Sequence, residues 1–460
     1  MSHLLRTGDR RAGPCHRRLT VLGAAVLGAL VVGSTLSACR MDRDDPAARG
    51  TPGPAFGVLG GSCDPDRVTA LAQAGVRLVE VGVDWGRFEP APQRFDQGYI
   101  DDLRVRLARC ADAGLGVVLT PGFQYAPAWV LDLPDGVYLD QYGNASPAQV
   151  PNYAFSAAVR DAAQRYFDRF AAEFPLDRFA AVRVGTSEAG ELGYPSRQFG
   201  TEGNGFWAFD DAALTGNGLP VGAEPNPMPG WLPGERTWQG RPVDTAAVRS
   251  WFDWYADSAA RTVLWQIGLL RDRGFHGPVH MPLAGRGVLP ADLAAATAAA
   301  LDGTADHDGS LERGLFYPDQ LRTIAGATGM GNVLADVTGV GDATAVAARE
   351  LDPPQDSCQA TDTSLPLREA AFVDTWSATR WTVANARAAG LRVVGENPGP
   401  PATPGNGGDE SSDGLAGQLL HAPDYARECG LEVLMWAFED DLFSPDSEVS
   451  LDDLARRIRD

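Results

Sequence analysis

Residues 78–84 read Leu-Val-Glu-Val-Gly-Val-Asp and residues 116–120 read Gly-Val-Val-Leu-Thr, with an amphipathic stretch over 100–113 between them. Each short run is rich in β-branched residues and is bounded by small or polar residues, which is typical of a buried strand. The stretch between them has the apolar spacing of a helix that packs on one face. This part of the chain therefore predicts a strand, a helix and a second strand.

The same alternation continues along the chain, and it predicts eight strands with helices between them. A chain with eight β/α units has the number that a (β/α)8 TIM barrel needs, and in that fold every strand ends at the same face. A doubly wound sheet is the alternative, but the first strand lacks the Gly-rich phosphate turn of that fold. The predicted strands are 56–60, 78–84, 116–120, 180–185, 279–283, 333–338, 392–395 and 431–437, and the main predicted helices are 100–113, 155–174, 246–273, 369–389, 415–428 and 451–459.

Two connections are too long to be ordinary linkers. Residues 192–245, after strand 4, carry six aromatic side chains among many Gly and Pro, so we expect a long aromatic insertion that forms a wall of a binding site. Residues 399–414, after strand 7, are rich in Gly and Pro and are expected to be mobile. The aromatic residues of 251–255 lie in a predicted helix and are expected to pack in the core. The insertion aromatics are Phe199, Phe206, Trp207, Phe209, Trp231 and Trp238.

The N-terminus has the pattern of an export signal. Five arginines precede an uncharged apolar run over 19–36, and the run ends in Leu36-Ser37-Ala38-Cys39. This order fits a secretory signal, and the last four residues fit a bacterial lipobox in which Cys39 becomes the lipidated first residue. The alternative is a signal anchor that stays in the membrane, because the run is just long enough to span it. The expected division is a lipoprotein signal peptide over 1–38, a polar tether over 39–54 and a catalytic domain over 55–460.

The cysteines fit an exported protein. Outside the signal and the lipid site four cysteines remain, and four can form two disulfides in three ways. Cys63 follows the first predicted strand and Cys110 ends a predicted helix, which favours Cys63–Cys110 and leaves Cys358 with Cys429. A zinc site is the alternative, but no Cys-x-x-Cys or clustered His accompanies them, so no metal is assigned. We expect anchoring to the outer face of the cell membrane through the lipid on Cys39.

Charge and composition exclude several classes of function. The formal net charge is −21, from 60 acidic and 39 basic residues, and all 39 basic residues are arginines. Without lysine the chain cannot be a Schiff-base enzyme, a P-loop NTPase or a lysine-dependent kinase. A nucleic-acid partner is not expected, because binding one needs a basic patch. Eleven tryptophans in an acidic chain suit an oligosaccharide or polysaccharide, and no cofactor is expected.

Glutamates follow two of the predicted strands. Residues 185–196, after strand 4, contain Glu188 and Glu191, and Glu396 follows strand 7. Two acids brought to one barrel mouth are what glycosidic bond cleavage needs, because one protonates the leaving oxygen while the other attacks the anomeric carbon or activates water. Glu188 could be the neighbouring carboxylate that raises the pKa of the acid. The alternative is that these glutamates only form hydrogen bonds or salt bridges.

Several motifs resemble those of glycoside hydrolase barrels. Residues 83–90, Val-Asp-Trp-Gly-Arg-Phe-Glu-Pro, resemble the opening of these barrels, and residues 118–121 with 126–129 resemble the Thr-Pro…Pro-x-Trp stretch of family 42 β-galactosidases. Residues 189–196, Ala-Gly-Glu-Leu-Gly-Tyr-Pro-Ser, resemble the Ala-Gly-Glu-Leu-x-Tyr-Pro-Ser motif of the family 14 β-amylases. Residues 395–397 and 440–442 also resemble late β-amylase segments. The resemblance implies a TIM-barrel glycoside hydrolase between these two families.

The resemblance implies an activity and a role for each glutamate. It implies a β-galactosidase-like, retaining hydrolase with Glu191 or Glu188 as the acid and Glu396 as the nucleophile. A β-amylase-like, inverting α-glucan hydrolase is the alternative, but residues 336–342 after strand 6 lack the glutamate that β-amylases use as the base. Family 42 enzymes place Asn before the acid, whereas Ser187 precedes Glu188 here. These departures leave a third alternative, a lipoprotein that binds carbohydrate without cleaving it.

Further polar and aromatic side chains near the predicted strand ends are expected to contact the sugar, by hydrogen bonds or by stacking on its ring. For Trp129 the alternative is an aromatic side chain buried beneath the loop. The expected substrate-binding residues are Asp84, Trp85, Gln124, Tyr125, Trp129, Tyr194, Asn397, Trp436 and Asp441.

Overall fold

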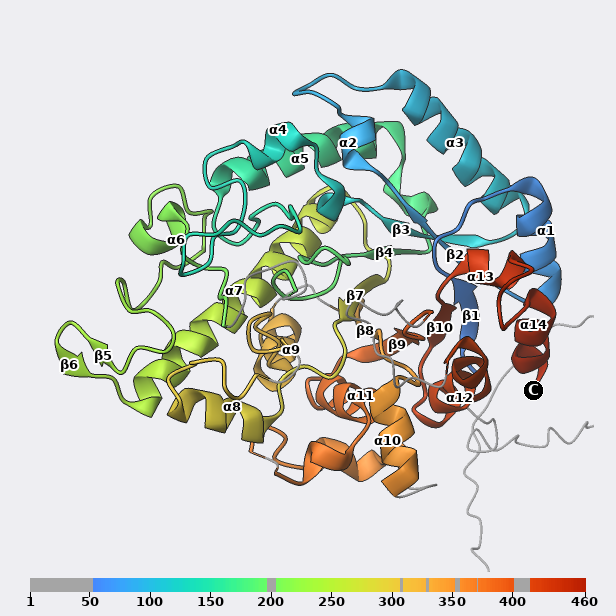
Figure 1. Ribbon diagram of the computed structural model, residues 1–460. Coiled ribbons are helices and arrows are strands. Elements are labelled where there is room, and N and C mark those ends of the chain that lie inside the picture. Colours follow the sequence, from blue (N-terminus) through green and yellow to red (C-terminus); the bar gives the residue numbers. More distant parts are fainter. Residues whose placement is uncertain are drawn as a thin grey trace, which may run out of the picture. The chain divides into compact units, whose positions relative to one another are not determined.

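The computed structural model describes residues 53–196, 204–306, 309–327, 331–351, 356–369, 371–400 and 414–460. Eight strands close into a barrel in the order β1-β10-β9-β8-β7-β4-β3-β2, and every neighbouring pair is parallel (Figure 1). All eight predicted strands are present, so the (β/α)8 TIM barrel is confirmed. The strands are β1 (Ala55–Val58), β2 (Leu78–Gly82), β3 (Gly116–Thr120), β4 (Ala181–Arg183), β7 (Val279–Leu283), β8 (Val333–Val337), β9 (Arg392–Glu396) and β10 (Val433–Trp436).

Helices surround the ring of strands (Figure 1). In α3 the buried residues Ile100, Leu103 and Leu107 recur at helical spacing, so one face of the helix packs on the barrel. The helix begins at Asp96, whose side chain accepts a hydrogen bond from the backbone N–H of Tyr99. The helices are α1 (Pro65–Ala74), α2 (Trp85–Phe88), α3 (Gln97–Asp112), α4 (Ala128–Leu131), α5 (Ala157–Glu173), α6 (Asp211–Thr215), α7 (Thr245–Asp272), α8 (Pro290–Ala298), α9 (Tyr317–Gly326), α10 (Ala343–Leu351), α11 (Ala378–Ala388), α12 (Gly414–Glu428), α13 (Glu439–Phe443) and α14 (Leu451–Arg459).

The aromatic insertion after β4 is present, with α6 and the short hairpin of β5 (Thr237–Trp238) and β6 (Arg241–Pro242), and none of its described residues, 192–196 and 204–245, lines the cavity at the barrel mouth. Phe206, Trp207 and Trp231 are buried, and the rings of Phe206 and Trp231 lie 5.4 and 5.5 Å from that of Trp251 on α7. These rings pack on the helix because burial removes their large apolar surface from water. Of the other insertion aromatics, Phe209 is buried, Trp238 is partly buried and Phe199 lies outside the described residues.

The aromatic residues of 251–255 pack as predicted. Trp251, Phe252 and Tyr255 are fully buried, and Trp254 packs partly buried against the same core. The Tyr255 hydroxyl donates to the backbone carbonyl of Glu312 at 2.6 Å and accepts from the N–H of Trp207 at 3.0 Å. Helix α7 therefore joins the insertion to the barrel through its aromatic face.

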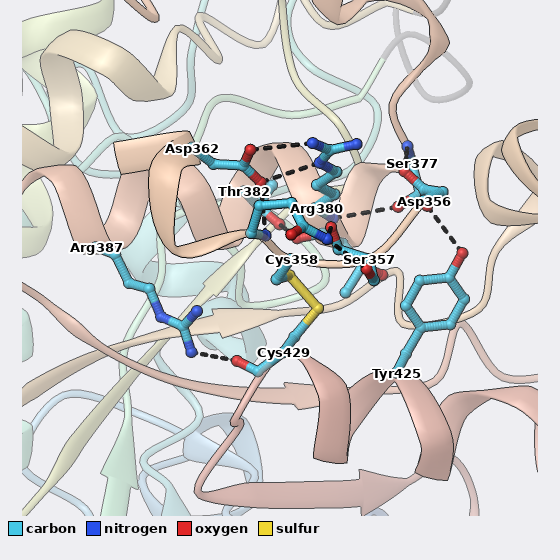
Figure 2. Close-up of a disulfide and its surroundings, with 12 residues drawn as sticks. Asp356, Ser357, Cys358, Asp362, Ser377, Arg380, Thr382, Arg387, Tyr425 and Cys429 are labelled. Carbon is cyan, nitrogen blue, oxygen red and sulfur yellow. Dashed lines mark hydrogen bonds and ion pairs between the residues drawn. A yellow bond between two sulfur atoms is a disulfide. The ribbon is translucent and has the colours of Figure 1, made fainter. Parts of the chain in front are cut away.

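Both predicted disulfides are present. Cys63–Cys110 ties the segment before α1 to α3, and Cys358–Cys429 ties the segment after α10 to the residue after α12 (Figure 2). Each bridge joins two connections that lie outside the ring of strands. The alternative zinc site is therefore wrong, because all four cysteines are consumed in pairs.

Figure 2 shows how the segment after α10 is held around the second disulfide. Asp356 accepts a hydrogen bond from the Tyr425 hydroxyl at 2.8 Å and from the backbone N–H of Ser377 at 3.1 Å. Arg380 on α11 forms two hydrogen bonds of 3.0 Å to the carboxylate of Asp362. These contacts attach the segment to α11 and α12 independently of the sulfur bond.

The expected signal peptide and Cys39 lie outside the described residues, as do most of the tether and most of the Gly- and Pro-rich connection over 399–414. Over the ranges that the structure describes, no helix has both the length and the apolar character needed to cross a membrane.

Candidate active site

A cavity of about 960 Å³ lies at the carboxyl ends of the barrel strands. Arg183 and Glu396 are the last residues of β4 and β9, and Thr338 directly follows β8. Functional side chains of TIM-barrel enzymes concentrate at this face. The charged and hydroxyl-bearing residues that line the cavity are Glu80, Arg106, Arg183, Glu191, Arg286, Ser310, Arg313, Thr338, Asp342, Thr344 and Glu396, together with Thr120, Ser62 and Tyr125.

Glu396 is held in this cavity by Arg183. Nη1 and Nη2 of the guanidinium donate to the two carboxylate oxygens of Glu396 at 2.5 and 3.2 Å, in the bidentate geometry that fixes a carboxylate most firmly. Asp336 on β8 is a second carboxylate beside the same guanidinium, 3.6 Å from Nη1 and fully buried. Burial raises the pKa of Glu396 to about 7, Arg183 opposes the rise and Asp336 adds to it.

Glu191 reaches the same cavity from the segment after β4. Its two carboxylate oxygens accept hydrogen bonds from Arg313 Nη2 at 2.8 Å and from the Thr338 hydroxyl at 3.1 Å. A tight turn places it there, because a Cβ on Gly185 would lie 1.9 Å from the carbonyl oxygen of Gly190 and Gly190 itself has a φ of +72°. The structure therefore brings Glu191 and Glu396 into one cavity, each beside its own arginine.

Glu188 does not line the cavity. Its carboxylate accepts from the backbone N–H of Ser196, with both oxygens at 3.3 Å, and so closes the loop that follows β4. Of the two glutamates in this loop, the structure therefore places Glu191 and not Glu188 in the lining of the cavity.

Three of the expected sugar contacts do line the cavity: Gln124, Tyr125 and Asn397. Tyr125 is 52% exposed, so its ring is free to meet a ligand. Asn397 is buried, donates to Gln418 Oε1 at 2.7 Å and accepts from the N–H of Ala437 at 2.8 Å. Asn397 therefore braces the end of β9 against the end of β10 at the rim of the cavity.

Asp84, Trp85 and Trp129 do not line the cavity. Asp84 caps α2 by accepting from the N–H of Arg87, and Trp85 is fully buried with its ring stacked on Tyr166 at 4.7 Å. The partly buried Trp129 packs edge-on against Trp85 and donates its indole N–H to a backbone carbonyl, as in the alternative reading of this residue. The two tryptophan rings pack against other side chains because burial removes their large apolar surface from water, whereas Asp84 is held by its capping hydrogen bond.

Tyr194, Trp436 and Asp441 are also absent from the lining. Tyr194 is stacked on Tyr255 at 4.1 Å, and Trp436 is buried within β10. Asp441 accepts from the backbone N–H of Phe438 and so begins α13. The sequence placed all three next to strand ends, but it did not tell which way their side chains point.

Sequence reasoning missed Arg183, Arg313, Asp336 and Phe438. Arg183 carried a signal, since an arginine inside a predicted buried strand needs a buried acid as its partner. Asp336 carried the same signal, since it lies inside the predicted strand over 333–338, whereas Arg313 lies in no predicted strand and gave none. Phe438 follows β10, lines the cavity and is 45% exposed, so it presents a second ring to a ligand.

Within the described ranges, no group of three or more His, Cys, Asp or Glu side chains is arranged to hold a metal ion.

No protein-family model and no curated protein match the sequence, but solved structures do. The catalytic domain of a β-amylase from Paenibacillus polymyxa matches with a TM-score of 0.53 and 14% identity, over 88% of this chain and 95% of that one. β-Galactosidases from Marinomonas ef1 and from the haloarchaeon Halorubrum lacusprofundi each match with a TM-score of 0.50, at 13% and 15% identity. Each match covers 84% of this chain, which spans about half the length of those enzymes, 54% and 52%. The structural neighbours are thus TIM-barrel glycoside hydrolases, and at these identities the likeness is one of fold.

Proposed function

We propose that the chain is a glycoside hydrolase that cleaves O-glycosidic bonds in the cavity at the carboxyl ends of the barrel strands. One observation carries the proposal: Glu191 follows β4 and Glu396 ends β9, and both line the same cavity, where each is oriented by an arginine. Cleavage of a glycosidic bond uses two carboxyl groups at one site, one as the acid and one as the nucleophile or base. The shared fold with a β-amylase and β-galactosidases is in keeping with it.

In the proposed mechanism Glu191 protonates the leaving oxygen while the Glu396 carboxylate attacks the anomeric carbon. The bond from carbon to the leaving oxygen breaks, and a glycosyl ester of Glu396 forms. Water then attacks the same carbon, and Glu191 takes its proton as the ester bond breaks. Arg183 aims the attacking carboxylate through two hydrogen bonds, and Thr338 with Arg313 fixes Glu191.

The substrate is proposed to be a β-galactoside-like sugar, cleaved with retention. The position of Glu396 at the end of the seventh barrel strand supports this, because family 42 enzymes, which the sequence resembles, carry their nucleophile there. A second candidate is inverting cleavage of an α-glucan, favoured by the match over 95% of a β-amylase catalytic domain and by the motif over 189–196. The substrate that is cleaved, a β-galactoside or an α-glucan, separates the two candidates. Proton NMR of the first anomer released then tests the stereochemistry, since retention on a β-galactoside and inversion on an α-glucan both give the β-anomer and the α-anomer would contradict either proposal.

A panel of nitrophenyl glycosides and maltooligosaccharides tests the proposal on wild type, Glu191→Gln and Glu396→Gln. Each glutamine variant is expected to lose at least about a hundredfold in kcat/KM, the lower range for a positioned acid, base or nucleophile. Glu188→Gln is the matched control, because it makes the same change in the same loop outside the cavity. Sugar binding by the wild type without turnover would instead identify a carbohydrate-binding lipoprotein, and activity that survives both substitutions would end the assignment.

We further propose that the protein is exported and anchored by lipid on Cys39 to the outer face of the cell membrane. The lipobox sequence Leu36-Ser37-Ala38-Cys39 after an apolar run and the two disulfides, which form in oxidising compartments, support this. Incorporation of radiolabelled palmitate into wild type but not into Cys39→Ser is the expected result. A labelled Cys39→Ser protein, or an unlabelled wild type that stays membrane-bound, would favour another form of attachment.

A further inference from the structure

A buried carboxyl group of the barrel interior lies outside the cavity, and the proposed reaction does not use it. Asp336 lies on β8, is fully buried and does not line the cavity, so it cannot touch a sugar there. Neither of its carboxylate oxygens has a hydrogen-bond partner. A buried carboxylate without hydrogen bonds is costly, and such groups recur where function requires them.

Asp336 stands beside the same cation that holds Glu396. Nη1 of Arg183 lies 2.5 Å from Glu396 and 3.6 Å from Asp336. Asp336 is in register with Val394, two residues before Glu396 on β9, so the two carboxyl groups point to the same interior face. One guanidinium charge therefore faces two buried carboxyl groups.

The other charged groups around this interior do not pair with either carboxyl group. Arg106 and Arg286 also line the cavity, but among the contacts of the described residues neither binds Asp336 or Glu396, and Arg106 donates to the backbone carbonyls of Gly61 and Ser62. Glu80 on β2 and Glu191 after β4 are further carboxylates, and the Arg313 guanidinium is bound to Glu191. His280, the register partner of Arg183 on β7, is buried, and burial with the Arg183 charge lowers its pKa to about 3, so it is neutral. Arg392, at the start of β9, pairs with Glu432 near the surface.

Helix α11, which packs against β8 and β9, also supplies no cation to the pair. Its Arg380 is bound to Asp362, and its Arg387 donates to the backbone carbonyl of Cys429 (Figure 2). Burial raises the pKa of Asp336, as it does that of Glu396, and Arg183 opposes both changes. At neutral pH the favourable state of the trio is one cation, one carboxylate and one carboxylic acid, because a second unpaired negative charge would be buried without compensation.

We propose that Asp336 is a positioning residue for Glu396: the two carboxyl groups compete for the guanidinium of Arg183 and share one proton, so Asp336 sets the pH at which Glu396 becomes a free carboxylate. The inference rests on the proposed function, in which Glu396 must be ionised to attack. Protonation of Asp336 leaves the whole charge of Arg183 to Glu396. When Asp336 is ionised, the two carboxylates share the charge of Arg183.

The pH profile of kcat/KM tests this role in wild type, Asp336→Asn and Asp336→Glu. The acidic limb of the wild-type profile is expected near the pKa of Glu396, and Asp336→Asn is expected to move it down by at least about one pH unit, because a competing negative charge is gone. Asp336→Glu restores the carboxyl group and should move the limb back. A limb that stays in place in Asp336→Asn, with only a lower melting temperature, would reduce Asp336 to a structural residue and overturn the proposal.

A second measurement does not depend on activity. Carbon-13 NMR of wild type labelled at the aspartate and glutamate side-chain carboxyls should show a buried carboxyl pair that releases a proton near neutral pH, and in Asp336→Asn the remaining Glu396 resonance should titrate at a lower pH. This result with no glycosidase activity would retain the proton-sharing pair and reject the proposed function. Glycosidase activity without any carboxyl group titrating near neutral pH would retain the proposed function and reject the proton-sharing pair.

Discussion

The shared proton of Asp336 and Glu396 predicts how the stability of the fold depends on pH. An acid with a raised pKa in the folded protein binds its proton more tightly there than in the unfolded chain, so it stabilises the fold below the unfolded pKa, and this contribution is lost as the pH rises through the folded pKa. For Glu396 the window runs from the ordinary value of 4.5 to about 7. A change of that size corresponds to about 3 kcal/mol of unfolding free energy.

Asp336→Asn isolates the part of this contribution that comes from Asp336, because the burial of Glu396 is common to both proteins. Other acids titrate in the same window, but they are common to both proteins and cancel when the two unfolding free energies are subtracted. Relative to the variant, wild type is therefore expected to lose at least about 1.4 kcal/mol of stability between about pH 4.5 and about pH 7, the equivalent of a change of one unit in the pKa of Glu396. Urea unfolding at a series of pH values, with the disulfides intact, measures the difference. Two parallel curves would show that no proton is shared and would refute the reasoning.

Three further predictions follow from the packing and from the cavity. Replacing both Cys358 and Cys429 by Ser should lower the unfolding free energy by about 4 kcal/mol, as expected for a bridge across 71 residues, which chemical denaturation can measure. Trp207→Ala should lower the unfolding free energy by about 3–5 kcal/mol in the same assay and leave kcat/KM unchanged, because this ring is buried outside the cavity. A large loss of kcat/KM at unchanged stability would instead show that the insertion forms a wall of the binding site. Tyr125→Ala and Phe438→Ala should each raise KM about fivefold in initial-rate assays, because each ring is exposed to the cavity, and an unchanged KM would exclude stacking.

The fold was predictable because its signals are local. A buried parallel strand needs a short apolar run, and each of the eight runs in the sequence is a strand of the barrel. The disulfide pairs also followed from position, since Cys63 and Cys110 flank neighbouring elements. In the site, the turn after β4 placed Glu191 in the cavity, and the end of β9 placed Glu396 there.

The rest of the site depends on side-chain direction, which the sequence does not specify. Residues 84 and 85 follow β2, yet a capping hydrogen bond and a buried stacked ring direct them away from the cavity. Arg183 and Asp336 become partners only when the barrel closes, because 153 positions separate them along the chain and β7 lies between their strands. Aromatic residues in the insertion suggested a binding surface, but the same composition also suits a core, and packing on α7 decides between the two.

Covalent trapping on the wild type tests the attack by Glu396 most directly. A 2-deoxy-2-fluoro-galactoside with a good leaving group should slow the release of the sugar, so that intact-mass analysis detects one added glycosyl group and peptide mapping places it on Glu396. If the parent galactoside is turned over but the added sugar is found on another carboxyl group, or no added sugar is found, then Glu396 is not the nucleophile.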